Sequence, residues 1–275
     1  MLKQRIVTAV VLLALLAGGL AWSALAFEVL ATVIVAVALG EWMRLVGWPR
    51  GRAVTGAALF GAVLLAAAVY APDWVAQALL PLSLLATIVW IALAALLLQP
   101  DAMALRLPRS ASTLLAVVMT AAAWVALVHF LLSGVVMLLS VMLIVWIADT
   151  AAYFAGRAFG RRKLAPHISP GKTWAGVVGA VVAVIAAALV AQWLAPDAAL
   201  LSNRLLQALG LAGALLLALV VAVSVVGDLF ESLLKRQAGV KDSGRVLPGH
   251  GGVYDRVDAL LPALPVAALL EWAAR

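Results

Sequence analysis

Residues 205–227 read LLQALGLAGALLLALVVAVSVVG and contain no charged side chain. A helix needs about 20 apolar residues to cross a bilayer core of about 30 Å. The stretch lacks the strict alternation of a barrel strand, and backbone amides find no water inside lipid, so only a helix satisfies them. It therefore predicts a membrane-spanning helix.

Similar apolar runs recur along the chain, which is 67% hydrophobic and 11% charged. Soluble domains are about half apolar and about a quarter charged. We find about nine candidate spans, of which the first, second and last are short. They lie near residues 6–22, 24–40, 54–70, 74–98, 112–132, 135–152, 173–194, 205–227 and 257–270. The sequence predicts an all-α, polytopic transmembrane protein with a single membrane domain over residues 1–275.

The basic residues indicate how the chain is oriented. If the amino terminus is cytoplasmic and nine helices follow, every Lys and Arg falls on the cytoplasmic side except Arg204 and Arg275. The positive-inside rule predicts this asymmetry, so the net charge of +7 is a topology signal. We expect a multi-pass protein of the inner cell membrane. A nucleic-acid partner is not expected, because the basic residues lie in short loops beside membrane helices.

The amino-terminal run has an alternative interpretation as a cleaved secretory signal, with Ala24-Leu25-Ala26 as the small-residue cleavage site. Cleavage would invert the charge pattern, so we favour a retained helix. Cysteine is absent, which excludes disulfides, thiolate zinc sites and a cysteine nucleophile.

Polar residues concentrate in two segments of the second half, 146–176 and 227–258, both assigned to the cytoplasmic side. Residues 1–145 are interpreted as a helical scaffold, and residues 146–275 as the half that carries the active site. Asp149 and Asp228 lie at the ends of predicted spans, where a carboxylate is costly to desolvate and a functional role is the default. Asp228, Ser232 and Lys235 are spaced to share one helical face.

The later segment ends in KDSGRVLPGHGGVYDRVD, residues 241–258. A glycine-rich loop lets backbone amides approach an anion closely. Magnesium prefers one or two carboxylates together with phosphate oxygens, and the acids here stand among cations that suit phosphates. The pattern predicts a site for a magnesium-bound polyphosphate. The alternative is a set of interfacial charges that pair with one another and with lipid headgroups.

The stretch Ser169-Pro170-Gly171-Lys172-Thr173 resembles the end of a Walker A loop, but Pro166 occupies the position of its first glycine. What remains is a helix start that favours a phosphate, or an ordinary cap with one snorkelling lysine. Of the three histidines, His129 is expected to be a hydrogen-bonded packing residue and His167 a loop residue. His250 could bind phosphate, transfer a proton or fix its loop.

Three fixed patterns follow one another in this region: S-x-x-K-R at residues 232–236, K-D at 241–242 and H-G-G-x-x-D-R-x-D at 250–258. Through them the chain resembles the phosphatidate cytidylyltransferase family, also called CDP-diacylglycerol synthases. Asp149-Thr150 and Lys172-Thr173-Trp174 are similar to the family's earlier cytoplasmic segment. Ala175 departs from it, because glutamate is common there. The first half resembles the family only in being helical and hydrophobic.

The resemblance implies that CTP and phosphatidic acid react to give CDP-diacylglycerol and pyrophosphate, with Mg²⁺ required and a second cation as a further option. It implies Asp228 and Asp255 as metal ligands, and a catalytic set that adds Lys235, His250 and Arg256. Together the pattern and the resemblance assign substrate binding to Asp149, Lys172, Thr173, Ser232, Arg236, Lys241, Asp242, Gly251 and Gly252.

The resemblance also implies a homodimer among membrane lipids. Two other functions stay open at this point. One is an ion-coupled transporter, for which acids within the membrane are also expected. The other is a different CTP-dependent lipid transferase or kinase.

Overall fold

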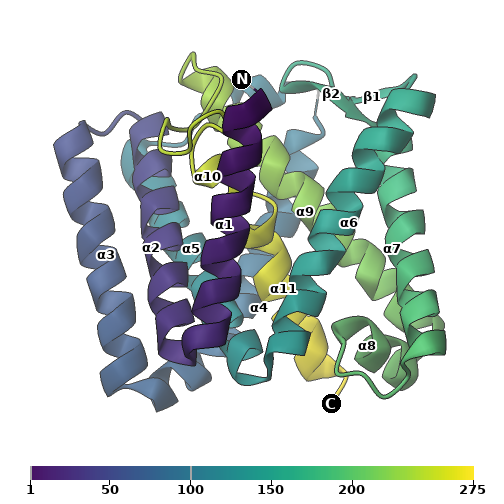
Figure 1. Cartoon of the computed structure of the whole chain (residues 1–275). Coiled ribbons are helices and arrows are strands. Elements are labelled where there is room, and N and C mark those ends of the chain that lie inside the picture. Colours follow the sequence, from purple (N-terminus) through teal and green to yellow (C-terminus); the bar gives the residue numbers. More distant parts are fainter. Residues whose placement is uncertain (1, 100) are drawn as a thin grey trace.

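The computed structural model describes residues 2–99 and 101–275 and is built almost entirely of helices (Figure 1). The elements are α1 (Leu2–Trp22), α2 (Ala24–Leu45), α3 (Arg50–Tyr70), α4 (Pro72–Leu97), η1 (Ala102–Ala104), α5 (Arg109–Leu132), α6 (Val135–Phe159), β1 (Lys163–Ala165), β2 (Ser169–Thr173), α7 (Trp174–Leu194), α8 (Leu201–Leu209), α9 (Leu211–Gln237), α10 (Tyr254–Val257) and α11 (Leu260–Ala273).

Within the described residues, 7 helices are long and apolar enough to cross a membrane, namely α2 to α7 and α9. The prediction of a polytopic helical membrane protein is therefore confirmed. The predicted number of spans is not confirmed. Among the residues whose side chains the structure describes, α1 offers the shorter apolar segment Val10–Trp22, and α11 has 14 residues.

The stretch 205–227 contains a helix long and apolar enough to span the membrane, α9, but it is not one helix, so its predicted start was wrong. Gly210 adopts a φ of 54°, which a right-handed helix cannot contain, so α8 ends at Leu209 and α9 begins at Leu211. Helix α9 then continues past Gly227 to Gln237, so its last turns carry polar side chains. The last predicted span, 257–270, is likewise divided between α10 and α11.

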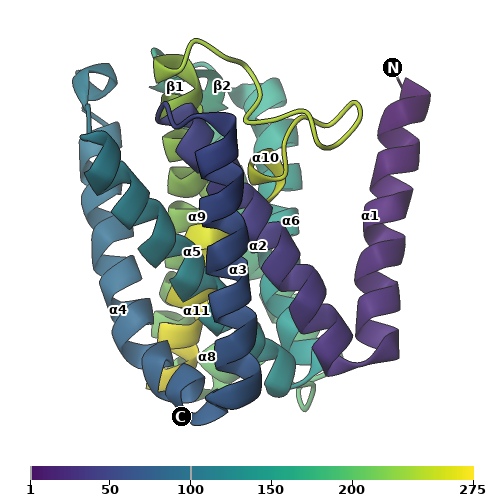
Figure 2. The same cartoon turned by 90° about the vertical axis from the view of Figure 1, so that its left-hand side faces the viewer.

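Helix α11 lies at the centre of the molecule and is buried over almost its whole length. It packs against α4, α5 and α9, as the two orthogonal views show (Figure 2). A helix that is apolar on all sides is stable only when neighbours cover every face. Gly227 lets α9 approach the start of α11, because a side chain there would collide with the carbonyl oxygen of Asp258.

Four buried aromatic rings connect α2, α4, α9 and α10. Trp42 stacks on Tyr254, with ring centroids 5.3 Å apart and planes 8° apart. Phe230 lies 5.2 Å from Trp42 and 5.9 Å from Trp90, the latter edge to face. Aromatic pairs of this kind add about 0.5–1.5 kcal/mol beyond their buried area. They fix α10, which carries Asp255, against α2 and α9.

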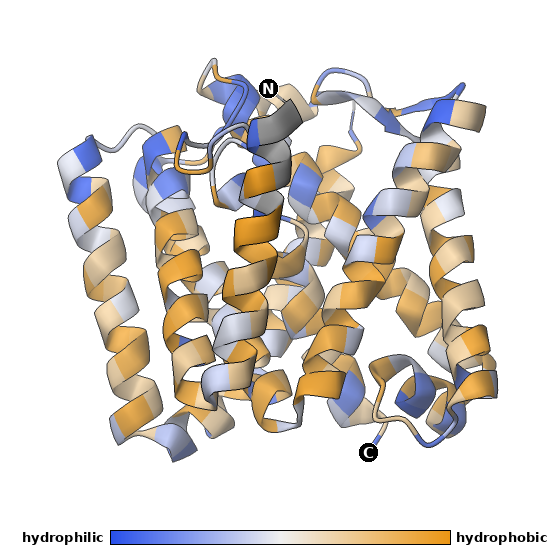
Figure 3. Ribbon diagram, in the orientation of Figure 1, coloured by the Kyte–Doolittle hydropathy of each residue, from blue (hydrophilic) through white to orange (hydrophobic). Residues whose placement is uncertain are grey.

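Most hydrophilic segments lie at one end of the helix bundle, and fewer lie at the other end, around α8 (Figure 3). This end holds the amino terminus, the β1–β2 hairpin and the loop between α9 and α10, whereas α8 and the carboxyl terminus lie at the other end. Strands β1 and β2 pair in an antiparallel hairpin that the sequence analysis did not predict. The two polar segments thus meet at the same end.

Candidate active site

Helix α9 supplies one polar face, as its spacing predicted. The Ser232 hydroxyl donates to Asp228 over 3.4 Å, and the Lys235 ammonium lies 2.5 Å from Glu231, one turn earlier. Both side chains are largely buried: that of Glu231 is 1% exposed and that of Lys235 is 14% exposed. The helical period brings these groups together on one face of α9. Glu231 belongs to this polar face, and the sequence analysis missed it.

Three carboxylates form a group that is suited to a hard cation. Ligand oxygens of Asp228, Glu231 and Asp258 all lie within 4.8 Å of one another. Burial, and then the negative charge of Asp228, raise the pKa of Asp258 well above its usual range. One Glu231 oxygen, Oε1, is buried without a hydrogen-bond partner. A Mg²⁺ ion bound here would offset the repulsion between the three acids and coordinate the unpaired Glu231 oxygen, so the residues present fit this cation. We call these three residues the acid group.

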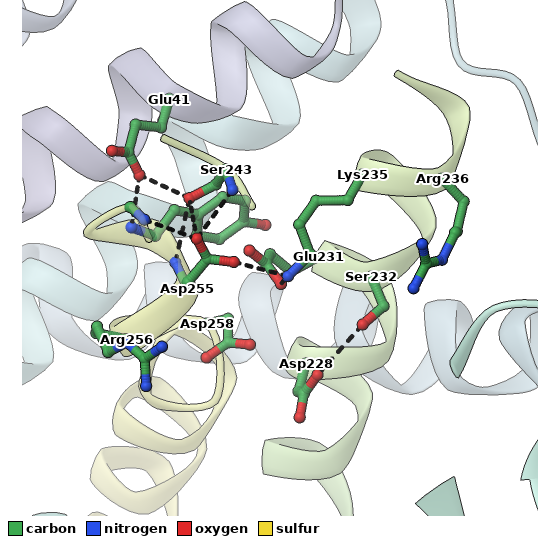
Figure 4. A network of polar contacts seen from close by, with 12 residues as sticks. Glu41, Asp228, Glu231, Ser232, Lys235, Arg236, Ser243, Asp255, Arg256 and Asp258 are labelled. Carbon is green, nitrogen blue, oxygen red and sulfur yellow. Dashed lines mark hydrogen bonds and ion pairs between the residues drawn. The ribbon is translucent and has the colours of Figure 1, made fainter. Parts of the chain in front are cut away.

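Asp255 lies beside the acid group, but both of its carboxylate oxygens contact other residues (Figure 4). Its Oδ1 is 2.7 Å from the Lys235 ammonium. Its Oδ2 accepts hydrogen bonds from the Ser243 amide at 2.9 Å, the Ser243 hydroxyl at 3.0 Å and the Gly252 amide at 2.8 Å. The structure thus gathers Asp228 with Asp258 and Glu231, whereas the predicted ligand Asp255 pairs with a lysine.

Burial alone would raise the pKa of Asp255. Hydrogen bonding with Glu231 and Lys235, and then with the Gly252 and Ser243 amides, outweighs burial and lowers the pKa to about 2. Asp255 is therefore an ionised anchor that ties the loop between α9 and α10 to Lys235.

The earlier polar segment, residues 146–176, reaches the acid group through Lys172. Its ammonium lies 2.7 Å from Asp228, and a cavity of about 360 Å³ is lined by both residues together with Asp149, Tyr153 and Thr173. Thr173 also caps α7, because its hydroxyl accepts a hydrogen bond from the Gly176 amide at 3.1 Å. The predicted substrate residues Asp149, Lys172 and Thr173 are thus brought to one cavity that opens beside Asp228.

The loop from Val240 to Val253 contributes the remaining predicted residues. Lys241 and Asp242 are exposed, and Gly251 has a φ of 86°, a conformation that favours glycine. Arg256 donates to the carbonyl of His250, at 2.7 Å from Nη2, and so closes the turn rather than facing an acid. His250 Nδ1 is buried without a partner. Arg236 points to the hairpin, where its Nε donates to Ile168 over 3.3 Å.

Glu41 is a further residue that the sequence analysis missed. It lies near the end of α2, within the half interpreted as scaffold, and its carboxylate accepts hydrogen bonds from Ser243 and Tyr254. An acid close to the end of a predicted span was the available signal, the same one that singled out Asp149. His129, by contrast, pairs with Glu271 at 3.2 Å at the opposite end, as expected of a packing residue.

Comparisons with known proteins agree with the motifs. The model of the cytidylyltransferase family matches residues 3–273. A phosphatidate cytidylyltransferase of Pseudomonas aeruginosa is 43% identical over 283 residues, which covers 100% of this chain and 98% of that protein. One from Haemophilus influenzae is 47% identical over 133 residues, covering 48% and 44% of the two chains. One from Brucella suis is 52% identical over 128 residues, covering 46% and 42%.

Proposed function

The chain belongs to the cytidylyltransferase family, and on that premise we propose that it transfers the cytidylyl group of CTP to phosphatidic acid. A phosphate oxygen of phosphatidic acid forms a bond to the α-phosphorus of CTP. The bond from that phosphorus to the β-phosphate bridging oxygen breaks, and pyrophosphate leaves with the electron pair. The products are CDP-diacylglycerol and pyrophosphate.

One observation carries this proposal: Asp228 of the acid group and Lys172 of the earlier polar segment pair with each other and line the same cavity. Asp228, Glu231 and Asp258 are the residues that would hold Mg²⁺ in this geometry. When bound there, Mg²⁺ would neutralise charge on the phosphate oxygens. The acids without a cation would repel both phosphate substrates, so the positive charge of Lys172 alone does not suffice.

The chain's own residues bind and orient the substrates. Lys172 pairs with Asp228 and Lys235 pairs with Glu231, so both ammonium groups lie against the acid group. Lys172 also lines the cavity, where its ammonium would attract phosphate oxygens. The attacking phosphate monoester is already largely a dianion near neutral pH, so the reaction requires no strong general base. Catalysis then depends on positioning and on neutralisation of charge.

We further propose that this end of the bundle faces the cytoplasm of the cell, in the inner membrane. The basic loops gather there, and CTP is a cytoplasmic solute, whereas the acyl chains of phosphatidic acid remain in the bilayer. The chain acts as a homodimer in this proposal, which rests on the family resemblance. Chemical crosslinking in native membranes would test the dimer, and crosslinking that yields only monomers at all reagent concentrations would contradict it.

The reaction is tested with purified protein, CTP labelled at the α-phosphate, phosphatidic acid and Mg²⁺. We expect a labelled lipid together with an equal amount of pyrophosphate. CTP labelled at the γ-phosphate distinguishes a kinase, because a kinase would label the lipid from that position and release CDP. Labelled lipid from γ-labelled CTP, or no turnover with either label, would overturn the proposal.

A further inference from the structure

Glu41 is a buried carboxylate that lies outside every motif of the family signature. Its residue is 4% exposed, and its Oε2 accepts hydrogen bonds from the Ser243 hydroxyl and the Tyr254 amide, both at 2.8 Å (Figure 4). The two partners are 202 and 213 residues away from Glu41 in the sequence: Ser243 lies in the loop between α9 and α10, and Tyr254 is the first residue of α10. A single carboxylate of α2 thus holds this loop at an internal residue, Ser243, and at its far end, where α10 begins at Tyr254.

Two glycines leave the space that the Glu41 carboxylate fills. A side chain at Gly244 or at Gly252 would collide with its oxygens. Neither glycine has a positive φ, so their backbone conformation does not require glycine. The requirement is one of space, and the loop is therefore shaped around this carboxylate.

Ser243 connects Glu41 to the proposed reaction site. Its hydroxyl lies 2.8 Å from Glu41 and 3.0 Å from Asp255, and its amide also donates to Asp255. Asp255 in turn holds the Lys235 ammonium at 2.7 Å, and that ammonium lies 2.5 Å from Glu231 of the acid group. A continuous series of polar contacts therefore runs from α2 to the acid group.

We propose that Glu41 is a positioning residue: by holding Ser243 and Tyr254 it keeps Asp255 in place, and Asp255 holds Lys235 against the acid group. The effect of Glu41 on catalysis rests on the proposed function. Displacement of a catalytic group by about 1 Å can lower turnover about 100-fold. A residue that only stabilised the fold would leave the turnover of correctly folded protein unchanged.

The main test compares Glu41→Ala, Glu41→Gln and the control Glu28→Ala. Glu28 lies in the same helix at the end away from the site. We expect Glu41→Ala to lower kcat about 10- to 100-fold, with little change in the KM for phosphatidic acid. Glu41→Gln should recover most of the activity, because its carbonyl oxygen accepts the same two hydrogen bonds. Wild-type kcat in Glu41→Ala, or no recovery in Glu41→Gln, would overturn the proposal.

Ser243→Ala provides the second variant, and it remains informative if Glu41→Ala does not fold. It should lower kcat on its own. Where both fold, the double variant should lose little more than the more impaired single variant, because the two residues act in series. Losses that multiply would mean that Glu41 acts independently of Ser243.

Hydrogen exchange on the ligand-free protein separates this inference from the proposed reaction. The amides of Ser243, Gly252 and Tyr254 should exchange at least about tenfold faster in Glu41→Ala than in wild type, and at the wild-type rate in Glu28→Ala. Unchanged exchange would overturn the positioning role even if the enzyme is active. If wild-type protein makes no CDP-diacylglycerol, the proposed function fails while the exchange result still decides whether Glu41 holds the loop.

Discussion

At the residue scale, the carboxylates of the site differ in their pKa values because each has different hydrogen-bond and charge partners. Burial raises the pKa of Asp255, but hydrogen bonding with Glu231 and Lys235 and with the Gly252 and Ser243 amides stabilises the ionised form and lowers the pKa to about 2. Asp258 is buried beside Asp228, and its pKa is raised. Asp258 therefore gains most from a bound cation, whereas Asp255 is already neutralised by the protein.

This difference predicts distinct effects for Asp258→Asn and Asp255→Asn. We expect Asp258→Asn to raise the Mg²⁺ concentration for half-maximal activity about tenfold or more, because a cation ligand is removed. Asp255→Asn should lower kcat about 100-fold without changing the Mg²⁺ dependence, because Lys235 loses its anchor. Activity is measured across a Mg²⁺ titration.

Asp73→Asn is the control for both variants, since Asp73 is exposed in the first turn of α4 at the opposite end. It should behave as wild type. A shifted Mg²⁺ dependence in Asp255→Asn together with an unchanged one in Asp258→Asn would return Asp255 to the metal site, as the family resemblance implies.

Lys235 compensates two buried acids, and its removal should destabilise the protein. Lys235→Met leaves Glu231 and Asp255 without their cation, a change that costs about 3–5 kcal/mol when a buried pair is broken. Thermal unfolding in detergent should show the loss. Adding Glu231→Gln should restore part of it, and the exposed Lys241→Met serves as a neutral control. A Lys235→Met protein as stable as wild type would show that these acids are neutralised in some other way.

At the element scale, the site depends on close approach between α9 and the start of α11. Asp228 and Glu231 come from α9, while Asp258 lies two residues before α11. Gly227 is a close contact between α9 and the start of α11. A backbone oxygen faces Gly227, and backbone cannot yield as a flexible side chain does.

Gly227→Ala should therefore separate the acids as well as destabilise the protein. We expect a loss of about 1–3 kcal/mol from overpacking, with turnover reduced at least about tenfold. Gly51→Ala in α3 is the matched control, because a side chain there meets no atom within 4 Å. That variant should keep its activity and its melting temperature. Equal behaviour of the two alanine variants would mean that this contact does not set the geometry of the acids.

At the scale of the whole molecule, the described part of the chain places most of its polar loops at one end of an apolar bundle. Exposed apolar side chains such as Leu59, Val63 and Val178 cover the sides of the helices, where lipid would contact them. The proposed orientation puts His167 in the cytoplasm and Asp197 outside, since they lie in loops at opposite ends of α7.

The absence of cysteine makes this orientation directly testable. His167→Cys and Asp197→Cys each introduce a single thiol at an exposed position. A membrane-impermeant maleimide added to intact cells with a permeable outer membrane should label Asp197→Cys and leave His167→Cys unlabelled until the inner membrane is opened. The wild-type chain is the unlabelled control, and the reverse pattern would invert the proposed topology.

The features that could be predicted from sequence are those set by local periodicity or by a fixed motif. Apolar length predicted the helical membrane fold, and helical spacing placed Asp228, Ser232 and Lys235 on one face. The motifs identified the family. Even there, Gly210 divided a run that composition alone presented as continuous.

The sequence by itself determined a polytopic helical membrane protein of the cytidylyltransferase family, because hydrophobic length and motif residues act locally. Only the tertiary structure decided that Asp258 and Glu231 join Asp228, that Asp255 is held by Lys235, and that Glu41 reaches Ser243 from α2. These contacts join residues on different helices or on either side of a loop. Their distances follow from helix packing around α11, which no local pattern in the sequence encodes.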